Sequence, residues 1–289
     1  MSPLALLLTH AVNALSLAAL LFFIALGLTL IFGIMRVVNF AHGALFMLGA
    51  YVGVSAMRLT GSFTLSLLAA PLAAAAIGLM FERATLMRLY GRDASATLLV
   101  TFGLSLVLNE AIRLIWGADA QQADLPPALS DVVFLLGEPF PIYRLALIGA
   151  GFACALTVWL LLHWTRLGLL TRAASQNAAM TTALGVDVAV LRSIVFALGC
   201  ALAALGGALA APLLTASLGL GGNVIIDAFL VVMIGGMGSF AGTVAGALLV
   251  GTVEAVGNYY VPDFALGTAY ALMIAVLLVR PGGLLGREA

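Results

Sequence analysis

The stretch Val12–Met35, which reads VNALSLAALLFFIALGLTLIFGIM, decides the fold and contains no charged residue. A membrane-spanning helix needs about 20 mostly apolar residues, so this run is long enough to cross a bilayer. Backbone groups in lipid must be satisfied inside helices or closed barrels, and barrel strands would show alternating segments of about ten residues. Since this run is continuously apolar, it predicts a transmembrane helix.

The whole chain has the composition of a protein whose solvent is lipid. It has 289 residues, of which 64% are hydrophobic and 8% charged, and its mean hydropathy is +1.20. A soluble domain carries about 25% charged residues. The net charge of +0 argues against a nucleic-acid partner. We therefore predict an all-α polytopic bundle that occupies residues 1–289 as a single transmembrane domain.

Further apolar runs predict about eight membrane spans in total. The predicted spans are residues 12–35, 40–58, 63–82, 94–116, 142–164, 190–215, 239–258 and 264–280. The apolar run Ile225–Met237 is too short to cross and contains or adjoins Gly235, Gly236 and Gly238, which predicts a re-entrant or broken half-helix. Broken helices at membrane depth are tolerated where they line a cavity, and they are typical of transporters.

The arginines predict the orientation, because cytoplasmic loops carry an excess of basic residues. They cluster in three places, which are Arg83, Arg88 and Arg92, then Arg166, Arg172 and Arg192, and finally Arg280 and Arg287. The connection 117–141 has four acidic residues and no arginine, so we place this loop outside. The N-terminus is then also outside, and a half-helix that returns the chain inward makes the C-terminus cytoplasmic.

Polar residues in or beside the predicted spans are candidates for a solute pathway, because such groups usually face the bundle interior or water. The candidates, with neighbouring glycines, are Asn39, His42, Gly43, Asp227, Gly235, Gly236 and Glu254. His42 has a structural alternative, a bond to a neighbouring carbonyl, and Asp227 has another, capping the half-helix. Glu254 has no evident partner in the sequence and is the stronger candidate. Glu110 and Arg113 are three residues apart and are expected to pair across a helical turn.

Glycines spaced four residues apart predict close helix packing. Gly238, Gly242 and Gly246 form one such series, and Gly49 and Gly53 form another. Helices in lipid associate by packing, and small residues let their backbones approach closely. The contact is either a translocation core or subunit interface, or ordinary packing inside one polypeptide. The sequence leaves both readings open.

One polar stretch interrupts the apolar runs, RLGLLTRAASQNAAMTTALGV at Arg166–Val186. Its composition predicts a short helix from about Arg172 to Leu184, which Gly185 ends at the C′ position. The helix either docks on a cytoplasmic partner protein or rests on anionic lipid headgroups. Its apolar face is shallow and rich in alanine, and no aromatic residue follows Trp164 in this loop. These features favour docking on protein.

Three stretches together resemble the inner-membrane permease subunit of the bacterial branched-chain amino-acid ABC importers. They are GLTLIFGIMRVVNFAHGALFMLGAY, TRLGLLTRAASQNAAMTTALGV and GGMGSFAGTVAGALLVG, in the family's order and spacing. The resemblance covers nearly the whole chain and is closest to the first, H-type permease. It implies a type II-like importer fold, a heterodimer with a second related permease, two cytoplasmic ATPase subunits and a periplasmic solute-binding protein.

The resemblance also implies that residues of about 165–189 form the loop that couples the permease to its ATPase. The candidate coupling residues are Arg166, Gly168, Arg172, Gln176, Asn177 and Gly185. The EAA motif of ABC permeases is only loosely recognisable here. The implied mechanism is alternating access between two permeases. The binding protein would dock near 117–141 and 216–224, and residues 225–240 and 39–43 would border the cavity.

ATP hydrolysis is expected on partner subunits. A P-loop requires a lysine on the phosphates, and all the basic residues of this chain are arginine. We expect ATP and Mg²⁺ on the partners and no cofactor on this chain. No metal-ligand cluster and no nucleophile with a base at motif spacing are visible, so no enzyme is predicted. The alternatives are transport of urea, short amides, or aromatic or dicarboxylic acids, a gradient-driven secondary transporter, and a channel.

Overall fold

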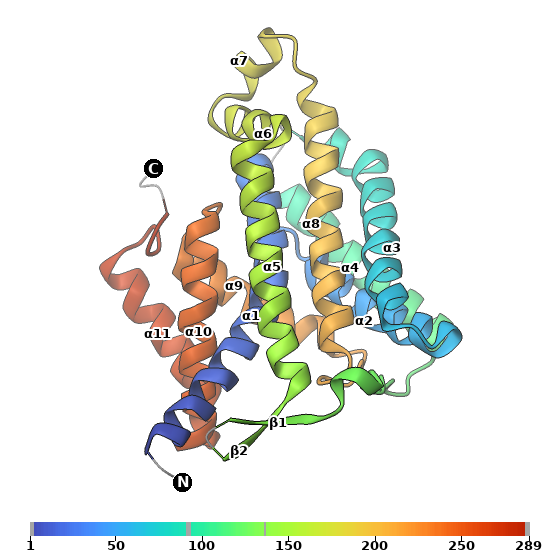
Figure 1. Cartoon of the computed structure of the whole chain (residues 1–289). Helices are drawn as coiled ribbons and strands as arrows, with labels where there is room; N and C mark the ends of the chain where they lie inside the picture. Colours follow the sequence, from blue (N-terminus) through green and yellow to red (C-terminus); the bar gives the residue numbers. More distant parts are fainter. Residues whose placement is uncertain (1–2, 91–93, 136, 287–289) are drawn as a thin grey trace.

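The computed structural model describes residues 3–90, 94–135 and 137–286, and most of that length is helical (Figure 1). The α-helices are α1 (Pro3–Met35), α2 (Ala41–Thr60), α3 (Phe63–Ala84), α4 (Ala94–Trp116), α5 (Ile142–Trp164), α6 (Arg166–Gln176), α7 (Ala178–Ala183), α8 (Val188–Ala210), α9 (Leu220–Gly235), α10 (Phe240–Tyr260) and α11 (Ala265–Val279). Short 3₁₀ helices occupy Leu86–Arg88, Pro127–Leu129 and Pro262–Phe264. Arg92 and Arg287, two of the arginines that predict the orientation, lie outside the described residues.

The predicted polytopic helical fold is confirmed. Among the described residues, seven helices are long and apolar enough to cross a membrane, namely α1, α2, α3, α4, α5, α8 and α10. Helices α9 and α11 are apolar but shorter. The loop 117–141 contains an element that the sequence did not predict, a hairpin in which β1 (Val132–Leu135) pairs antiparallel with β2 (Glu138–Pro141).

The predicted half-helix exists, but its predicted limits, Ile225–Met237, were wrong. Helix α9 begins five residues earlier, at Leu220, and ends at Gly235. Gly221, which precedes the predicted start, lies inside the helix and packs against the first turn of α2. A Cβ on Gly221 would lie 2.7 Å from the Gly43 carbonyl oxygen, which is too close for any larger residue. These glycines therefore allow two helix starts to touch.

The two ends of the bundle carry different elements (Figure 1). Helices α6 and α7 lie at one end, beyond α5 and α8, which we call the α6–α7 end. The N-terminus and the β1–β2 hairpin lie at the opposite end, which we call the hairpin end. Helix α1 runs from the hairpin end to the α6–α7 end, where it contacts α6 and α8.

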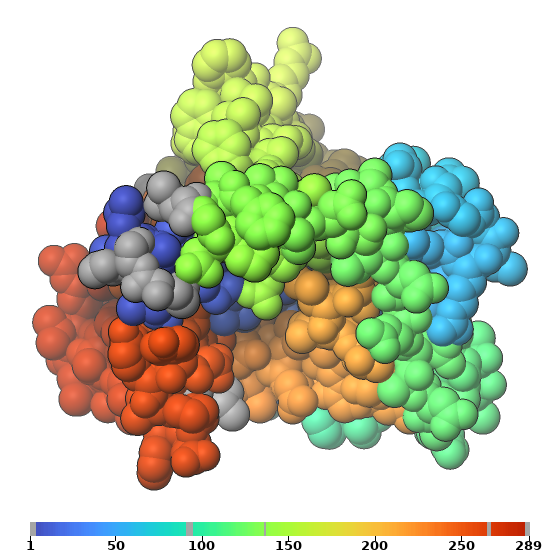
Figure 2. Space-filling view, turned by 60° about the horizontal axis from the view of Figure 1, so that its bottom comes forward, coloured from blue at the N-terminus to red at the C-terminus, as the bar shows by residue number. Residues whose placement is uncertain are grey.

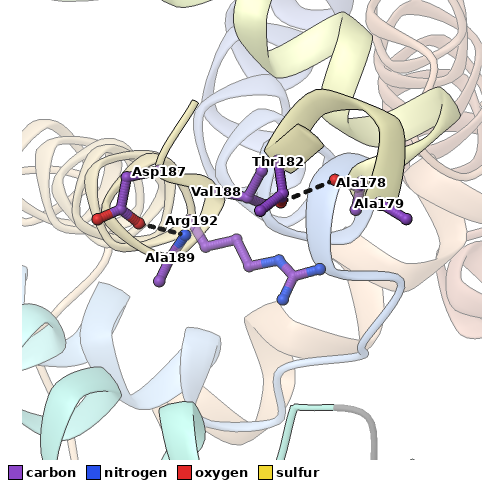
Figure 3. A pocket seen from close by; sticks show the side chains of 7 residues that line it. All are labelled: Ala178, Ala179, Thr182, Asp187, Val188, Ala189 and Arg192. Carbon is purple, nitrogen blue, oxygen red and sulfur yellow. Dashed lines mark hydrogen bonds between the residues drawn. The ribbon is translucent and has the colours of Figure 1, made fainter. Parts of the chain in front are cut away.

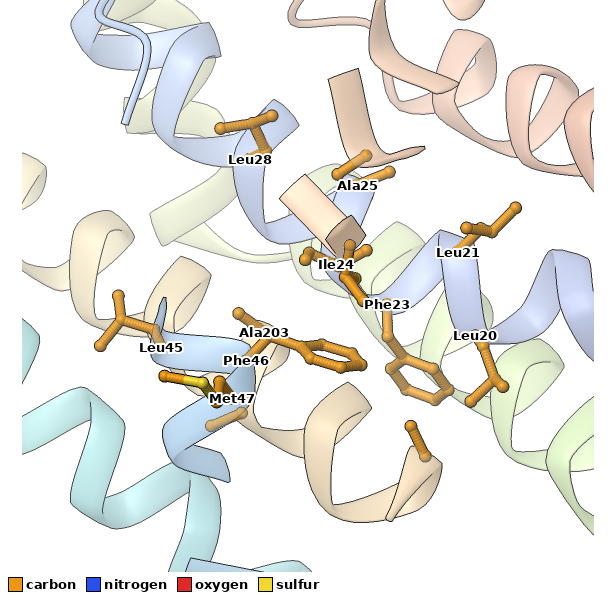
Figure 4. Close-up of a cluster of buried hydrophobic side chains, with 14 of the residues drawn as sticks. Leu20, Leu21, Phe23, Ile24, Ala25, Leu28, Leu45, Phe46, Met47 and Ala203 are labelled. Atoms are coloured by element: carbon orange, nitrogen blue, oxygen red, sulfur yellow. The ribbon is translucent and has the colours of Figure 1, made fainter. Parts of the chain in front are cut away.

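Helix α1 is the central helix of the bundle. In its most apolar window 83% of the residues are buried, against 17% for α4 and for α5. It packs against α8 and α10, and α8 also packs against α2 and α3. Side chains from α1, α2 and α8 meet in the core, where Phe23 and Ile24 face Phe46 and Ala203 (Figure 4). Helices α4 and α5 therefore form part of the periphery.

Candidate coupling segment and solute pathway

Helix α6 folds tightly back against the end of α5. The Thr165 hydroxyl accepts a hydrogen bond from the Gly168 amide at 3.2 Å, which caps the new helix. A Cβ on Gly168 would lie 2.5 Å from the Leu161 carbonyl oxygen, so only glycine permits this approach. The Arg172 guanidinium donates to the Leu162 carbonyl. Gly168 and Arg172 therefore hold α6 in place.

The prediction of a single helix from Arg172 to Leu184 is wrong, because the helix is interrupted at Asn177. The backbone of Asn177 is extended, with φ −150° and ψ 95°, and its side-chain oxygen accepts from the Met180 amide at 2.9 Å. Asparagine is a strong N-cap residue, so it ends α6 and starts α7. Helix α6 also begins earlier than predicted, at Arg166.

The prediction that Gly185 terminates the segment is confirmed. Its φ of +85° is left-handed, which favours glycine. The Gly185 amide donates to the Thr182 carbonyl at 2.9 Å, and the Val186 amide donates to the Thr181 carbonyl at 3.3 Å. This pair of bonds is the Schellman pattern of helix ends.

One face of α6 and α7 is held by the bundle and the other is open. Ala174 is buried in a small apolar cluster with Ile34 of α1 and Val188 of α8. The opposite surface carries Arg166, Gln176 and Asn177, which are exposed. It also carries large apolar side chains, which are Leu169 at 59% exposure, Met180 at 59% and Leu184 at 77%. A rigidly mounted face with exposed apolar groups suits contact with another protein.

His42 and Asn39 lie buried at the start of α2. The His42 Nε2 lies 3.0 Å from the Ile24 carbonyl oxygen, and the Asn39 side-chain oxygen accepts from the Ala41 amide at 3.0 Å. His42 therefore has the structural contact that was the alternative to a pathway role. Its Nδ1 and the Asn39 amide nitrogen are buried without a hydrogen-bond partner. Next to them, Gly43 contacts α9.

Asp227 and Glu254 lie on α9 and α10, two helices that pack against each other. Asp227 is half-buried in the middle of α9, and the N-cap of that helix is Gly219, so the predicted capping role is wrong. Glu254 is 8% exposed, and its Oε1 has no hydrogen-bond partner. Neither carboxylate forms an ion pair within the described part of the chain.

The predicted packing glycines make contacts within this polypeptide. Gly49 and Gly53 lie against Ala204 and Ala208 of α8. Gly242 packs against Gly235, and Gly246 against Val231, where α10 meets α9. At these positions the structure agrees with ordinary intrachain packing rather than with a subunit interface.

The turn between α9 and α10 contains the remaining predicted glycines. Gly236 has a φ of +106° and Gly238 a φ of +78°. Gly238 precedes the N-cap Ser239, so it lies outside α10 and does not continue the helical stripe of Gly242. Gly236 also lies against the C-terminal segment, where a Cβ would be 3.0 Å from the Gly282 carbonyl oxygen.

A buried polar cluster at the α6–α7 end was missed by the sequence reasoning. Glu82 of α3 is fully buried and accepts from the Tyr90 hydroxyl and from the Ser193 hydroxyl of α8, each at 2.6 Å. The Arg192 guanidinium lies over the Tyr90 ring at 5.0 Å. Burial and the bond to Glu82 raise the pKa of Tyr90 above its ordinary value. These residues are far apart in sequence, so no local spacing signals their contact.

The hairpin end brings together the two segments predicted to receive the binding protein. Gln121 and Ala216 exchange backbone hydrogen bonds of 2.8 and 2.9 Å. Arg58 donates to the Gln121 side chain and, at 3.2 Å, to the Gln122 carbonyl. Figure 2 shows the 117–141 segment, in green, beside the orange chain that follows α8.

The predicted pairing of Glu110 with Arg113 in α4 is also confirmed, with the Arg113 Nε 2.9 Å from the Glu110 Oε2.

Comparison with known proteins identifies the class of this membrane protein. Residues 10–278 match the family model described as the branched-chain amino acid transport system permease component. The chain belongs to this family. It is accordingly an ABC transporter permease with membrane-spanning helices, and the resemblance seen in the sequence is confirmed.

Relatives of this ABC transporter permease cover almost its full length. The high-affinity branched-chain amino acid permease BraD of Pseudomonas aeruginosa is 31% identical, covering 97% of this chain and 96% of BraD. A probable LivH permease of Methanocaldococcus jannaschii is 30% identical, covering 92% and 89%. The solved PsaBC structure from Streptococcus pneumoniae, in complex with Fab, has a TM-score of 0.52 at 12% identity, covering 93% and 91%. That similarity supports the fold alone.

Proposed function

We propose that this chain is the membrane-spanning subunit of an ATP-driven importer for branched-chain amino acids or related small polar solutes. The observation that carries the proposal is the family match over residues 10–278, which includes the pathway helices and the α6–α7 segment. Relatives named for branched-chain amino acid transport cover nearly the whole chain. The cargo class of this chain follows from those names, and urea, short amides, and aromatic or dicarboxylic acids are the alternatives within the family.

The orientation in the inner membrane follows from the arginines. Arg166 and Arg172 lie in α6, Arg192 lies near the start of α8, Arg36 follows the last residue of α1, and Arg83 and Arg88 lie at the end of α3 and just after it. Arg280 follows α11 and begins the C-terminal segment that packs against Gly236. Arg58, Arg113 and Arg144 instead lie near the end of α2, the end of α4 and the start of α5, which adjoin the 117–141 segment. Basic residues concentrate on the cytoplasmic side of membrane proteins. The α6–α7 end and the C-terminus are therefore cytoplasmic in this proposal, and the N-terminus and the hairpin are outside.

The partners in this proposal are a second related permease, two cytoplasmic ATPases and a periplasmic binding protein. The ATPase contacts the open face of α6 and α7, to which Arg166, Gln176 and Asn177 contribute. Because Gly168 and Arg172 hold α6 against α5, movement of that face moves the bundle as a body. The binding protein docks on the hairpin end. Alternating access then arises as the two permeases rock against each other.

The solute path in this proposal runs along α9 and α10, between the two permeases. Asn223 and Ile226 on α9 are exposed, and Asp227 is half-exposed beside them. Polar groups at membrane depth usually face a cavity or water, which supports a path at Asp227 and Glu254. Asn39, His42 and Gly43 are buried behind this face and support the start of α9 rather than line the path directly.

Uptake into proteoliposomes tests this function. We expect radiolabelled leucine to enter vesicles that hold this chain with its co-purifying permease and ATPases, only when ATP and the binding protein are present. A matched complex whose ATPase cannot hydrolyse ATP should show no uptake. Gradient-driven uptake by this chain alone would instead identify a secondary transporter. Steady flux that ignores ATP and the binding protein would identify a channel. Competition by urea, amides or dicarboxylates tests the cargo.

A further inference from the structure

A pocket of about 430 Å³ lies between α7 and the first turns of α8 (Figure 3). It is lined by Ala178, Ala179, Thr182, Asp187, Val188, Ala189 and Arg192. The small alanine side chains leave the space open, and Val188 is buried at its base. The pocket therefore adjoins the α6–α7 face but is separate from the exposed residues already assigned to coupling.

Arg192 is the cation of this pocket. Its Nε is buried without a hydrogen-bond partner, and its Cζ lies over the Tyr90 ring, 5.0 Å from the ring centroid. Among the described residues, the ion pair in the structure is the one between Glu110 and Arg113. Arg192 has no carboxylate oxygen within ion-pair distance. Arginine donors that lose water without a replacement partner are costly, so this site favours an anion.

The nearby carboxylates are already engaged elsewhere. Glu82 uses both oxygens, one for the Tyr90 hydroxyl and one for the Ser193 hydroxyl. Asp187 caps α8, since its Oδ1 accepts from the Ala189 and Val190 amides at 3.0 Å each. Figure 3 shows the Arg192 side chain extended below α7 and away from the Asp187 carboxylate. The anion that completes the site must therefore come from another molecule.

We propose that this pocket receives an aspartate or glutamate side chain of the cytoplasmic ATPase, which pairs with Arg192. The inference rests on the proposed function and adds a contact to it. Arginine and a carboxylate form two parallel charge-assisted hydrogen bonds, which fix orientation as well as affinity. Such a pair makes the first turns of α8, in addition to α6 and α7, part of the contact between the ATPase and the permease.

A protein carboxylate fits this pocket better than a lipid phosphate does. Asp187 also lines the pocket, and its negative charge repels a carboxylate or a phosphate alike unless the ligand also brings hydrogen-bond donors. A peptide segment brings backbone amides that can donate to Asp187 while its acidic side chain reaches Arg192. The exposed apolar side chains of Met180 and Leu184 beside the pocket would be covered by the same partner, which would exclude water from the pair.

Two variants test the pocket independently. Arg192→Gln removes the charge, and Ala179→Leu fills the space while leaving Arg192 intact. The matched controls are Arg88→Gln, which removes an exposed arginine at the same end, and Ala84→Leu, which enlarges an exposed alanine at the end of α3, outside both the pocket lining and the α6–α7 face. Each permease complex is placed in nanodiscs of zwitterionic lipid, and the dissociation constant of the purified ATPase is measured.

We expect Arg192→Gln and Ala179→Leu each to weaken ATPase binding at least tenfold, Arg192→Lys to weaken it less, and both controls to change it less than twofold. If the wild type binds the ATPase and neither pocket variant changes the constant, the pocket inference is wrong and the proposed function stands. If the wild type binds no ATPase in nanodiscs of either zwitterionic or anionic lipid, the proposed function itself fails. If binding requires anionic lipid, and Arg192→Gln abolishes that requirement, a lipid phosphate occupies the pocket and the inference is overturned.

A structural role for Arg192 is separated from a docking role by thermal unfolding of each variant. If Arg192→Gln loses binding because it loosens the contact with Tyr90, its unfolding temperature falls. In that case the ATPase dissociation constant of Ala179→Leu alone tests the pocket. Ala179 is exposed, so its enlargement leaves the fold intact. Weakened binding with unchanged unfolding supports the pocket. Wild-type binding by Ala179→Leu overturns it.

Discussion

Replacing Gly49 with alanine should loosen the contact between α2 and α8 and destabilise the fold. An added Cβ would lie 2.7 Å from the Ala204 carbonyl carbon and closer still to its oxygen. Ordinary carbon contacts begin near 3.5 Å, and the Ala204 Cα lies closer still, so the helices must separate by more than about 0.8 Å. Backbone atoms cannot rotate away, and α8 is also fixed against α1 and α3.

The expected loss for Gly49→Ala is about 3 kcal/mol in the free energy of unfolding, the upper end for overpacking. That corresponds to about a hundredfold in the folded-to-unfolded ratio. Neighbouring contacts, including the one between Gly53 and Ala208, also weaken when the gap opens. The measurement is equilibrium unfolding in mixed micelles by titration with SDS, followed by circular dichroism.

The matched control for this prediction is Gly149→Ala in α5. A Cβ there meets nothing within 4 Å, and alanine is the better helix former, so stability should stay equal or rise by up to about 1 kcal/mol. If Gly49→Ala unfolds at the same SDS fraction as Gly149→Ala, the close approach of α2 and α8 is not what stabilises this bundle.

Three further predictions concern individual polar side chains and one polar pair. Asn177→Ala removes the α7 cap and should destabilise that helix by about 1 kcal/mol, so the amides of 178–183 should exchange about five times faster with no change in global unfolding; unchanged exchange would refute the capping role. Glu254→Gln replaces a buried carboxylate whose Oε1 has no hydrogen-bond partner, and should raise stability by about 1 kcal/mol in SDS titration; a fall would reveal an unseen partner. The Thr29 and Thr243 hydroxyls lie 2.6 Å apart, and a double-mutant cycle to valine should give a coupling of about 0.6 kcal/mol, whereas zero coupling would contradict this bond.

Features set by local chemistry could be predicted from the sequence. The long apolar runs identify the spanning helices, because lipid leaves the backbone few alternatives. Gly185 was recognised as a helix end because a left-handed residue there needs no tertiary support. Glu110 and Arg113 were paired correctly because their spacing alone brings them together on a helix.

Features set by tertiary contact could not be predicted. The half-helix was predicted from the apolar run that begins at Ile225, whereas α9 begins at Leu220 and its Gly221 packs against Gly43. Asn177 stands in a run of alanines and other helix-compatible residues, so the prediction carried one helix through it, whereas in the structure it is the N-cap of α7. The bonds of Glu82 with Ser193 join distant parts of the chain, and no periodic pattern marks such a pair. The candidate solute residues were found by polarity, but whether each faces a path or a neighbour required the packing.

Site-specific photocrosslinking tests most directly whether a separate ATPase operates this permease through its α6–α7 end. A photoreactive residue is placed at Leu184, which is 77% exposed at that end, or at Phe134, which is 68% exposed in the hairpin. In the assembled importer, we predict that the Leu184 probe crosslinks to the ATPase and the Phe134 probe does not. Crosslinking of the ATPase from Phe134, or its absence at Leu184 in a complex that transports, would contradict both the orientation and the coupling.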